Sequence, residues 1–508
     1  MKEALAILGT GSDVGKSLIA TALCRLLYRS GMKVAPFKAQ NMSLNSFVTS
    51  DGGEMGRAQV LQAQACCLVP NVVMNPILLK PEADSQSQVI VQGKVWERCE
   101  AKEYFSKKTL LWDLVKSSYE KLTKSYEMIV IEGAGSAAEM NLRDRDIVNW
   151  PVVEMADAAV ILVADIDRGG VFAQIIGTMD LLAPEERQRV IGVVINKFRG
   201  DLSLFDDGIK IIEERTGVPV LGVLPYLRNL ELDQEDSVAI EQYRLTHFGA
   251  ETVNVAVVLL PHMSNFTDFN ELAAEPDVAL RYVASSKELL GADVIILPGS
   301  KTTIADLEHL INAGFEDALA LQVQGGSEIV GVCGGFQMLG EEISDPQHVE
   351  TGGISKGLGL LDVKTELLAQ KTTVQVRARA LSNFCDQEAL VEGYEIHMGA
   401  TTRATTVSPC FQIVLDDAQS SSSHYEKKDD GAMRADGLVW GTYIHGVFDQ
   451  PEFRRQWLNR IRVRKNLQPL AMETSQAVSA RLRHALDRWA DHVEQYCDVK
   501  KIKQLLGV

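Results

Sequence analysis

The segment Gly331–Gly340, with the sequence GVCGGFQMLG, joins an apolar run to the start of a helix. Ile329–Val332 predicts a buried strand, and Phe336 and Leu339 predict the first turns of a helix. Cys333 lies on the sharp turn between them, close to backbone N–H groups whose dipoles favour a thiolate and stabilise an oxyanion. A buried structural cysteine is the alternative. The glycines that frame the turn favour a nucleophile instead.

A nucleophilic cysteine requires a nearby group that accepts and returns a proton. The segment Trp440–Phe448, WGTYIHGVF, is a short β-like run that ends in a histidine followed by a glycine. This pattern places His445 at a strand end. We therefore predict a catalytic pair of Cys333 and His445.

The motifs G-x-C-G-G and Y-I-H-G together resemble those of class I glutamine amidotransferases. The resemblance implies that Cys333 attacks the glutamine amide and releases ammonia, while His445 shuttles protons. It also implies that Gly334 and the turn at Gly299 supply the oxyanion N–H groups and bind glutamine. Most members carry a glutamate two residues after the histidine, where this chain has Val447. That departure is typical of the cobyric-acid-type branch.

The missing glutamate leads to an expectation about activity. Without it, the His445 ring is predicted to be less well oriented and its imidazolium less stabilised. We therefore expect slow glutamine hydrolysis that rises when the substrates of a coupled site bind. A second histidine, His397, lies in the stretch Gly393–Gly399, which also resembles the same branch. We interpret His397 as a packed strand residue and not as a catalytic one.

A second functional pattern lies at the N-terminus. An apolar strand, Ala4–Leu8, is followed by GTGSDVGKS and an amphipathic helix to about Leu27. Strand, glycine-rich loop and helix form the context of a phosphate-binding loop. The pattern predicts an ATP site in which Gly11 and Gly15 shape the loop, Lys16 reaches the β- and γ-phosphates, and Ser17 ligates Mg²⁺. The loop resembles that of dethiobiotin-synthetase-like proteins.

Several strand ends supply further candidates for this site. Lys38 follows the strand Val34–Phe37, where it could meet phosphate or a substrate carboxylate. Glu132 follows the strand Met128–Ile131 and is predicted to be the second Mg²⁺ contact. Asn196 ends a later strand, and related nucleotide-binding domains use such an asparagine to read the adenine edge. Two acidic residues remain open as further metal contacts, namely Asp146, which could equally lie in a solvated loop, and Glu54.

The stretches around Lys38, Glu54 and Pro76 resemble cobyric acid synthases. The resemblance covers essentially the whole chain. It implies ATP- and glutamine-dependent amidation of the b, d, e and g carboxylates of adenosylcobyrinic acid a,c-diamide, through acyl phosphates. One alternative is the sister enzyme that amidates the a and c carboxylates. Another is a partition-like P-loop ATPase switch, disfavoured by Gly11, which stands where those proteins carry a signature lysine.

The composition argues against nucleic-acid binding, a disulfide scaffold and a membrane-spanning protein. The chain has 508 residues, 46% of them hydrophobic, enough for two or three domains. The formal net charge of -17 argues against a nucleic-acid partner. Eight scattered cysteines indicate reduced thiols, and no apolar run reaches membrane-spanning length. We expect a cytoplasmic protein with glutamine and an adenosylated corrinoid as its substrates, and a homo-oligomer is an open option.

Alternating strands and helices predict an α/β fold in both halves. The expected organisation is a doubly wound parallel sheet in a P-loop synthase domain over 1–228 and a linker over 229–251. A class I amidotransferase-like α/β domain is expected over 252–450, and a helical extension over 451–508. Within that extension, an apolar face formed by Leu482, Leu486, Trp489, Val493 and Tyr496 predicts a helix docked on the body.

Overall fold

The structure is a computed structural model that describes residues 3–82, 86–227, 230, 232, 243–381, 388–414, 428–472 and 478–507. Its chain groups into two compact units. The first contains Met1–Ser43, Glu54–Asp236 and Arg481–Val508, and the second contains Leu44–Gly53 and Ser237–Ala480. The domain limits expected from the sequence stay predictions, and most of the expected linker over 229–251 lies outside the described residues.

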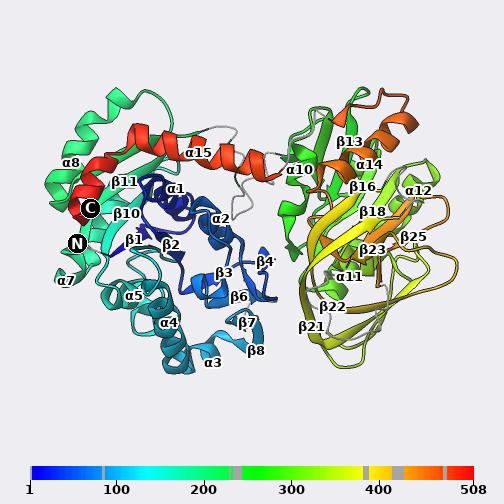
Figure 1. Cartoon of the computed structure of the whole chain (residues 1–508), viewed down its shortest axis with the longest axis horizontal. Coiled ribbons are helices and arrows are strands. Elements are labelled where there is room, and N and C mark those ends of the chain that lie inside the picture. The colour runs from blue at the N-terminus through cyan, green and yellow to red at the C-terminus, as the bar shows by residue number, and fades with distance from the viewer. Residues whose placement is uncertain are drawn as a thin grey trace. The chain divides into compact units, whose positions relative to one another are not determined.

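A six-stranded parallel sheet forms the centre of the first unit, in the order β12-β11-β10-β1-β9-β2. The strands are rich in β-branched residues and buried, as expected when helices cover both faces. This confirms the doubly wound fold (Figure 1). The strands are β1 (Ala4–Gly9), β2 (Val34–Phe37), β9 (Met128–Glu132), β10 (Ala159–Asp165), β11 (Val190–Phe198) and β12 (Val220–Pro225). The helices are α1 (Lys16–Arg29), α4 (Lys108–Thr123), α5 (Trp150–Met155), α6 (Val171–Leu181), α7 (Pro184–Arg187) and α8 (Asp206–Thr216).

A smaller four-stranded sheet follows β2 in the chain, with the order β3-β6-β7-β8. Beside it, β5 places Glu54 in a buried ion pair with Lys80 of β6, at 2.8 Å. Each of these buried charges requires the other, because a single charge without an ionic partner in the protein interior is strongly destabilising. The elements are β3 (Gln40–Met42), β5 (Glu54–Gly56), α2 (Arg57–Ala65), β6 (Ile77–Pro81), β7 (Gln86–Val91), β8 (Lys94–Glu100) and α3 (Ala101–Ser106).

Two helices lie at the C-terminus, α15 (Val478–Tyr496) and α16 (Val499–Leu506), and from Arg481 onward they belong to the first unit. Helix α15 lies beside α1 (Figure 1). Arg25 of α1 forms an ion pair with Asp487, and the Trp489 indole donates to the carbonyl of Leu18 at 2.7 Å. Leu486, Trp489 and Val493 are buried in the same hydrophobic core as α1. The predicted docking of this helix is confirmed.

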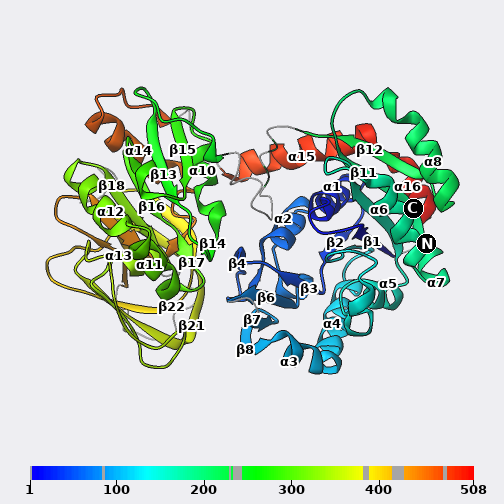
Figure 2. The same ribbon diagram turned by 180° about the vertical axis from the view of Figure 1, so that it is seen from behind.

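The second unit is built on another mainly parallel sheet, in the order β15-β13-β16-β18-β26-β25 (Figure 2). Only its last pair, β26 and β25, is antiparallel. This confirms the α/β prediction for the second half. Its strands are β13 (Val253–Val258), β15 (Val278–Val283), β16 (Val294–Leu297), β18 (Glu328–Val332), β25 (Ala432–Met433) and β26 (Val439–Thr442). The helices are α10 (Asn270–Ala273), α11 (Thr303–Asn312), α12 (Phe315–Gln324), α13 (Gly334–Leu339) and α14 (Pro451–Arg464).

A second, mixed sheet in this unit is dominated by the long hairpin of β21 and β22. At one edge of this sheet, β22 pairs with β27, so that Tyr394 lies opposite His445. The members are β19 (Glu342–Asp345), β20 (Gly353–Lys356), β21 (Val363–Ala380), β22 (Leu390–Arg403), β23 (Phe411–Val414), β24 (Asp429–Asp430) and β27 (Ile444–His445). Two short strands, β14 (Met263–Ser264) and β17 (Gly299–Ser300), pair separately, and β4 (Ser46–Val48) comes from the Leu44–Gly53 segment.

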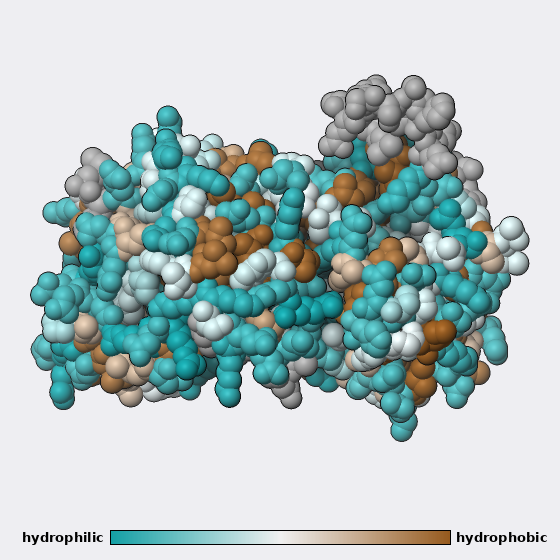
Figure 3. Space-filling view, turned by 90° about the horizontal axis from the view of Figure 1, so that it is seen from below, coloured by the Kyte–Doolittle hydropathy of each residue, from teal (hydrophilic) through white to brown (hydrophobic). Residues whose placement is uncertain are grey.

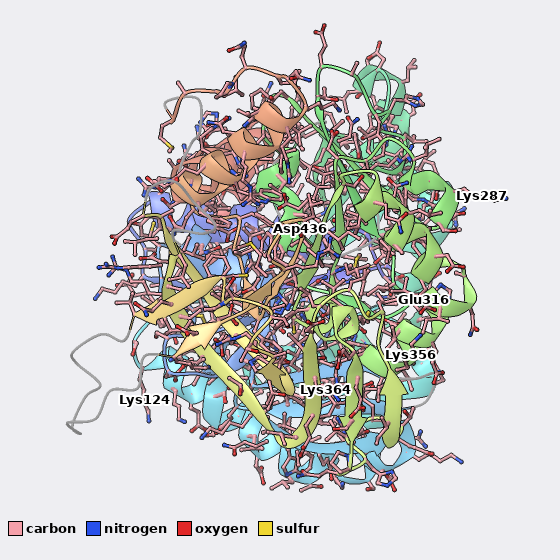
Figure 4. All side chains as sticks on the ribbon, turned by 90° about the vertical axis from the view of Figure 1, so that its right-hand side faces the viewer. Lys124, Lys287, Glu316, Lys356, Lys364 and Asp436 are labelled. Carbon is pink, nitrogen blue, oxygen red and sulfur yellow. The ribbon has the colours of Figure 1, made fainter. Side chains whose placement is uncertain are left out.

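Hydrophilic side chains cover most of the face drawn in Figure 3, and the apolar ones gather in small patches. Lys356 and Glu316 lie together on the second unit in Figure 4, with their charged atoms 3.1 Å apart. The Lys356 side chain is 80% exposed, so this ion pair contributes little to stability. None of the described helices is long and apolar enough to cross a bilayer.

Candidate active sites in the two units

The phosphate loop lies between β1 and α1, where the strand order of the first sheet reverses. Gly15 has φ +97°, and a Cβ there would lie 2.2 Å from the Asn196 amide nitrogen. Glycine is therefore required both for the backbone conformation and for the close approach. The Lys16 ammonium donates to the carbonyls of Gly11 and Gly135, each at 2.9 Å. The predicted loop residues come together as a cradle.

Asn196 supports this loop from β11. Its amide nitrogen donates to the carbonyl of Val14 at 2.9 Å, and its oxygen accepts from the Lys197 N–H at 2.9 Å. Both ends of the side chain are thus engaged by the protein. The predicted contact with an adenine edge stays a prediction, and the geometry shown is that of a residue that fixes the loop.

Glu132 is the centre of a buried polar cluster at the ends of β1, β9 and β2. One carboxylate oxygen accepts from the Ser17 hydroxyl and from the Lys38 ammonium, each at 2.7 Å. The other accepts from the amides of Gln59 and Gln62. Burial raises the pKa of Glu132, but the Lys38 ammonium and these hydrogen bonds outweigh it and hold the pKa below its usual value. Glu132 is therefore an ionised carboxylate beside the phosphate loop.

The other two acidic residues have structural partners. Asp146 accepts from the N–H groups of Val148, Asn149 and Trp150, and so caps the start of α5. Glu54 forms the buried ion pair with Lys80. Of the three acidic candidates, Glu132 alone contacts a side chain of the phosphate loop in the hydrogen bonds described here.

Cys333 occupies a strained turn between β18 and α13, with φ 52° and ψ -108°. The turn is closely packed, because a Cβ on Gly335 would lie 2.0 Å from the carbonyl oxygen of Leu297. A Cβ on Gly334 would lie 2.9 Å from the Ser300 nitrogen, so the turn of β17 adjoins the elbow. A Cβ on Gly299 would lie 3.2 Å from the His445 ring. The four residues predicted for glutamine chemistry are thus brought together.

A carboxylate orients the His445 ring, although Val447 stands where most class I amidotransferases carry the glutamate. The ring nitrogen Nδ1 lies 2.7 Å from Oδ2 of Asp268, and Oδ1 of Asp268 accepts from the Gly446 N–H at 3.1 Å. Asp268 comes from the short helix η4 (Phe266–Phe269), far from Val447 in the sequence. The expectation that His445 lacks an orienting carboxylate is wrong, because a residue from another element fills that place.

The protonation of His445 follows from this environment. Burial lowers the pKa of the imidazole, but the Asp268 carboxylate and the interaction with Cys333 raise it to about 10. His445 is therefore an imidazolium at neutral pH, with its proton available to a leaving group. Sequence reasoning missed Asp268. The available signal was a polar residue between Phe266 and Phe269, shortly after the first strand of the second half.

The interpretation of His397 agrees with its surroundings. Its ring stacks on Tyr443 with centroids 3.8 Å apart, and Nδ1 lies 2.8 Å from the carbonyl oxygen of Gly399. Tyr443 in turn accepts from the Gln337 amide at 3.1 Å. None of the hydrogen bonds described for His397 involves Cys333 or His445.

The fold and the two sites define a glutamine amidotransferase joined to a P-loop nucleotide-binding unit. Residues 254–453 match the family described as CobB/CobQ-like glutamine amidotransferase domain, and residues 5–239 match the CobQ/CobB/MinD/ParA nucleotide binding domain. Full-length similarity is more specific. Cobyric acid synthase from Salmonella dublin is 47% identical over 512 residues, which cover 100% of this chain and 99% of that relative.

Two further relatives carry the same name. Cobyric acid synthase from Streptococcus sanguinis is 46% identical, with 100% of this chain and 99% of the relative covered. The protein from Syntrophobacter fumaroxidans is 45% identical, with 99% and 98% covered. The chain belongs to the cobyric acid synthase family, a family of glutamine-dependent amide ligases. A partition-like ATPase switch is excluded as the description of the whole chain.

Proposed function

We propose that this protein uses ATP and glutamine to amidate the b, d, e and g carboxylates of adenosylcobyrinic acid a,c-diamide. The observation that carries the proposal is that one chain of this family brings together the candidate residues of both sites. One site has a cysteine, an imidazolium and an orienting carboxylate. The other has a phosphate loop beside an ionised glutamate. Ammonia made at the first site is consumed at the second.

At the glutaminase site, the Cys333 sulfur attacks the side-chain amide carbon of glutamine. Backbone N–H groups at Gly334 and in the turn after Gly299 stabilise the developing oxyanion. His445 then gives its proton to the leaving nitrogen, and a glutamyl thioester forms as ammonia departs. Water hydrolyses the thioester to glutamate and returns the cysteine. Asp268 holds the imidazolium in place throughout.

At the synthase site, a carboxylate of the corrinoid attacks the γ-phosphorus of ATP. A carboxylate does not react with ammonia directly, because oxide is a poor leaving group. The acyl phosphate has a good leaving group, so ammonia displaces inorganic phosphate and forms the amide. Lys16 compensates the charge of the transferring phosphoryl group, and Gly11 and Gly15 let the backbone approach it. Lys38 holds Glu132 in its ionised form.

The same residues fit a magnesium ion. Mg²⁺ is bound in proteins by one or two carboxylates together with phosphate oxygens. Ser17 and Glu132 place a hydroxyl and an ionised carboxylate 2.7 Å apart beside the loop. When bound, the ion would neutralise charge on the phosphates. We propose Ser17 and Glu132 as its protein ligands.

Glu132→Gln is expected to raise the Mg²⁺ concentration needed for half-maximal synthesis by about tenfold or more, because a neutral amide is a weaker ligand for a hard cation. Ammonia-dependent synthesis, titrated with Mg²⁺ at saturating ATP, measures this change. Glu139→Gln is a control in the same unit, where Glu139 is an exposed residue. An unchanged Mg²⁺ requirement in Glu132→Gln would contradict the assignment.

Asp268→Asn is expected to lower kcat for glutamine hydrolysis by about 10²–10⁴. The carboxylate is the main group that raises the pKa of His445, while the opposing effect of burial remains in the variant. Its imidazole therefore loses its proton at a lower pH. The pH profile of kcat/KM should fall near pH 10 in the unmodified protein and at distinctly lower pH in the variant. If kcat/KM fell at the same alkaline pH in the variant and in the unmodified protein, the role of Asp268 would be wrong. Ammonia-dependent synthesis by the variant serves as the internal control.

The proposed function is tested by incubating the protein with ATP, Mg²⁺, glutamine and adenosylcobyrinic acid a,c-diamide, and measuring the mass of the corrinoid. Four successive amidations are expected. No amidation of this substrate, or amidation only when the precursor without a and c amides is supplied in its place, would reject the proposal.

A further inference from the structure

One short piece of the N-terminal half belongs to the second unit. The chain leaves the first unit after Ser43 and returns to it at Glu54. Between these points, Leu44–Gly53 packs with the second unit, where Val48, Tyr394 and Ile396 share a small hydrophobic cluster. The segment is therefore part of the unit that contains Cys333 and His445.

Ser46 holds two side chains that contact His445. Its N–H donates to Oδ1 of Asn265 at 3.0 Å, and its carbonyl accepts from the Tyr394 hydroxyl at 3.1 Å. The Tyr394 ring stacks on the imidazole, with centroids 5.2 Å apart and planes inclined by 16°. One backbone residue of the segment thus fixes two neighbours of the catalytic ring.

Asn265 also contacts the His445 ring. Its amide nitrogen lies 3.4 Å from Nε2 and 3.5 Å from Nδ1 of His445. These distances are long for hydrogen bonds, so the contact acts mainly as packing against the ring. Asn265 is buried and has φ 53°, a left-handed conformation that the surroundings must maintain. The hydrogen bond from Ser46 helps to hold it there.

The segment also supports the strand beside the nucleophile. Val48 packs with Ile396 of β22, and the carbonyl of Ile396 lies 3.6 Å from the Cys333 sulfur. Two hydrogen bonds from β21 hold the segment down, from Gln375 to the Val48 carbonyl and from Thr373 to the Gly52 carbonyl, each at 2.9 Å. Both members of the catalytic pair therefore depend on neighbours that Leu44–Gly53 packs against.

Both ends of the segment continue into buried ion pairs of the first unit. Lys38, a few residues before it, binds Glu132 at 2.7 Å, and Glu54, directly after it, binds Lys80 at 2.8 Å. Glu132 is the carboxylate proposed to meet Mg²⁺. A change in the charge around Glu132 alters the partner of Lys38, and the intervening backbone connects that lysine to Ser46.

We propose that Leu44–Gly53 is a positioning element of the glutaminase site, which links the state of the Lys38–Glu132 pair to the orientation of the His445 ring through Asn265 and Tyr394. This inference rests on the proposed function. It gives a different basis to the expectation that glutamine hydrolysis rises when ATP and corrinoid bind, since the absent-glutamate explanation is wrong. Asn265 and Tyr394 act through His445 and are positioning residues.

The first test changes Asn265 to glycine, which removes the side chain but accepts a positive φ. Glutamine hydrolysis is expected to fall about tenfold or more in kcat, since small misplacements of a catalytic group are costly. KM for glutamine and ammonia-dependent synthesis should stay near the values of the unmodified protein. A proportional loss with glutamine and with ammonia would overturn the proposal, because a role in positioning His445 affects the glutamine route alone.

The second test loosens the segment without touching His445. The double variant Thr373→Val, Gln375→Leu removes both hydrogen bonds from β21. Its glutamine hydrolysis should lose most of the increase caused by ATP, Mg²⁺ and corrinoid. Thr402→Val is the matched control, because that hydroxyl also donates to a backbone carbonyl of the same hairpin, Lys364, outside the segment. The control should keep the full increase.

The outcomes separate the inference from the function on which it rests. If the unmodified protein failed to amidate the corrinoid even with ammonia, the proposed function would be wrong. If it amidated normally while Asn265→Gly and the double variant responded to ATP and corrinoid as the unmodified protein does, the positioning role of Leu44–Gly53 alone would be wrong.

Discussion

Cys333→Ser is expected to lower glutamine-dependent synthesis by at least about 10³-fold and to leave ammonia-dependent synthesis intact. The serine hydroxyl stays protonated near neutral pH and is a much weaker nucleophile than a cysteine thiolate. The synthase residues belong to the other unit, so their chemistry does not require the thiol. Initial rates of corrinoid amidation with glutamine and with ammonium chloride measure both routes.

Cys410→Ser is the matched control for this change. Cys410 is buried in the same unit, and its sulfur lies 3.7 Å from the Gly441 carbonyl, outside the catalytic pair. This variant should keep glutamine-dependent synthesis. If Cys333→Ser lost the ammonia route as well, the separation of glutamine hydrolysis from amidation would be wrong.

Lys16→Ala is expected to lower synthesis by at least about 10³-fold with either nitrogen source. Lys16 is 7% exposed, and its ammonium donates to the carbonyls of Gly11 and Gly135 at the phosphate loop. The transferring phosphoryl group would therefore lose its main charge partner.

The rates of ADP formation and of ammonia-dependent amidation measure this loss. Lys121→Ala removes the same charge from an exposed position of α4 and should leave both rates unchanged. Basal glutamine hydrolysis should persist in Lys16→Ala, because Cys333, His445 and Asp268 belong to the other unit. Ammonia-dependent turnover of Lys16→Ala close to that of the unmodified protein would contradict the acyl-phosphate route.

Features set by a few adjacent residues could be predicted from the sequence. The phosphate loop is a strand, a glycine-rich turn and a helix, and the elbow at Cys333 is the same arrangement in another unit. The alternation of β-branched strands with helices predicted a parallel sheet in each half of the chain. Glu132 met the loop as expected, since carboxyl ends of neighbouring parallel strands share one edge.

Features that depend on distant pairing could not be predicted in this way. Asp268 and His445 meet because η4 follows β13 and β27 pairs with β22, and neither fact is visible in the local pattern. The stretches around Lys38 and Glu54, which resemble cobyric acid synthases, enclose Ser46 in the sequence and do not indicate which unit it joins. The structure groups Leu44–Gly53 with the second unit, through packing on Tyr394 and Ile396 that a linear reading does not reveal.

The most direct test of the central claim follows the nitrogen and the phosphate together. Unmodified protein is incubated with ATP, Mg²⁺, glutamine labelled with ¹⁵N in its amide, and adenosylcobyrinic acid a,c-diamide whose free carboxylates carry ¹⁸O. The account predicts ¹⁵N in every new amide of the corrinoid and ¹⁸O in the inorganic phosphate, with ADP as the nucleotide product. Amides without ¹⁵N, phosphate without ¹⁸O, or formation of AMP would contradict it.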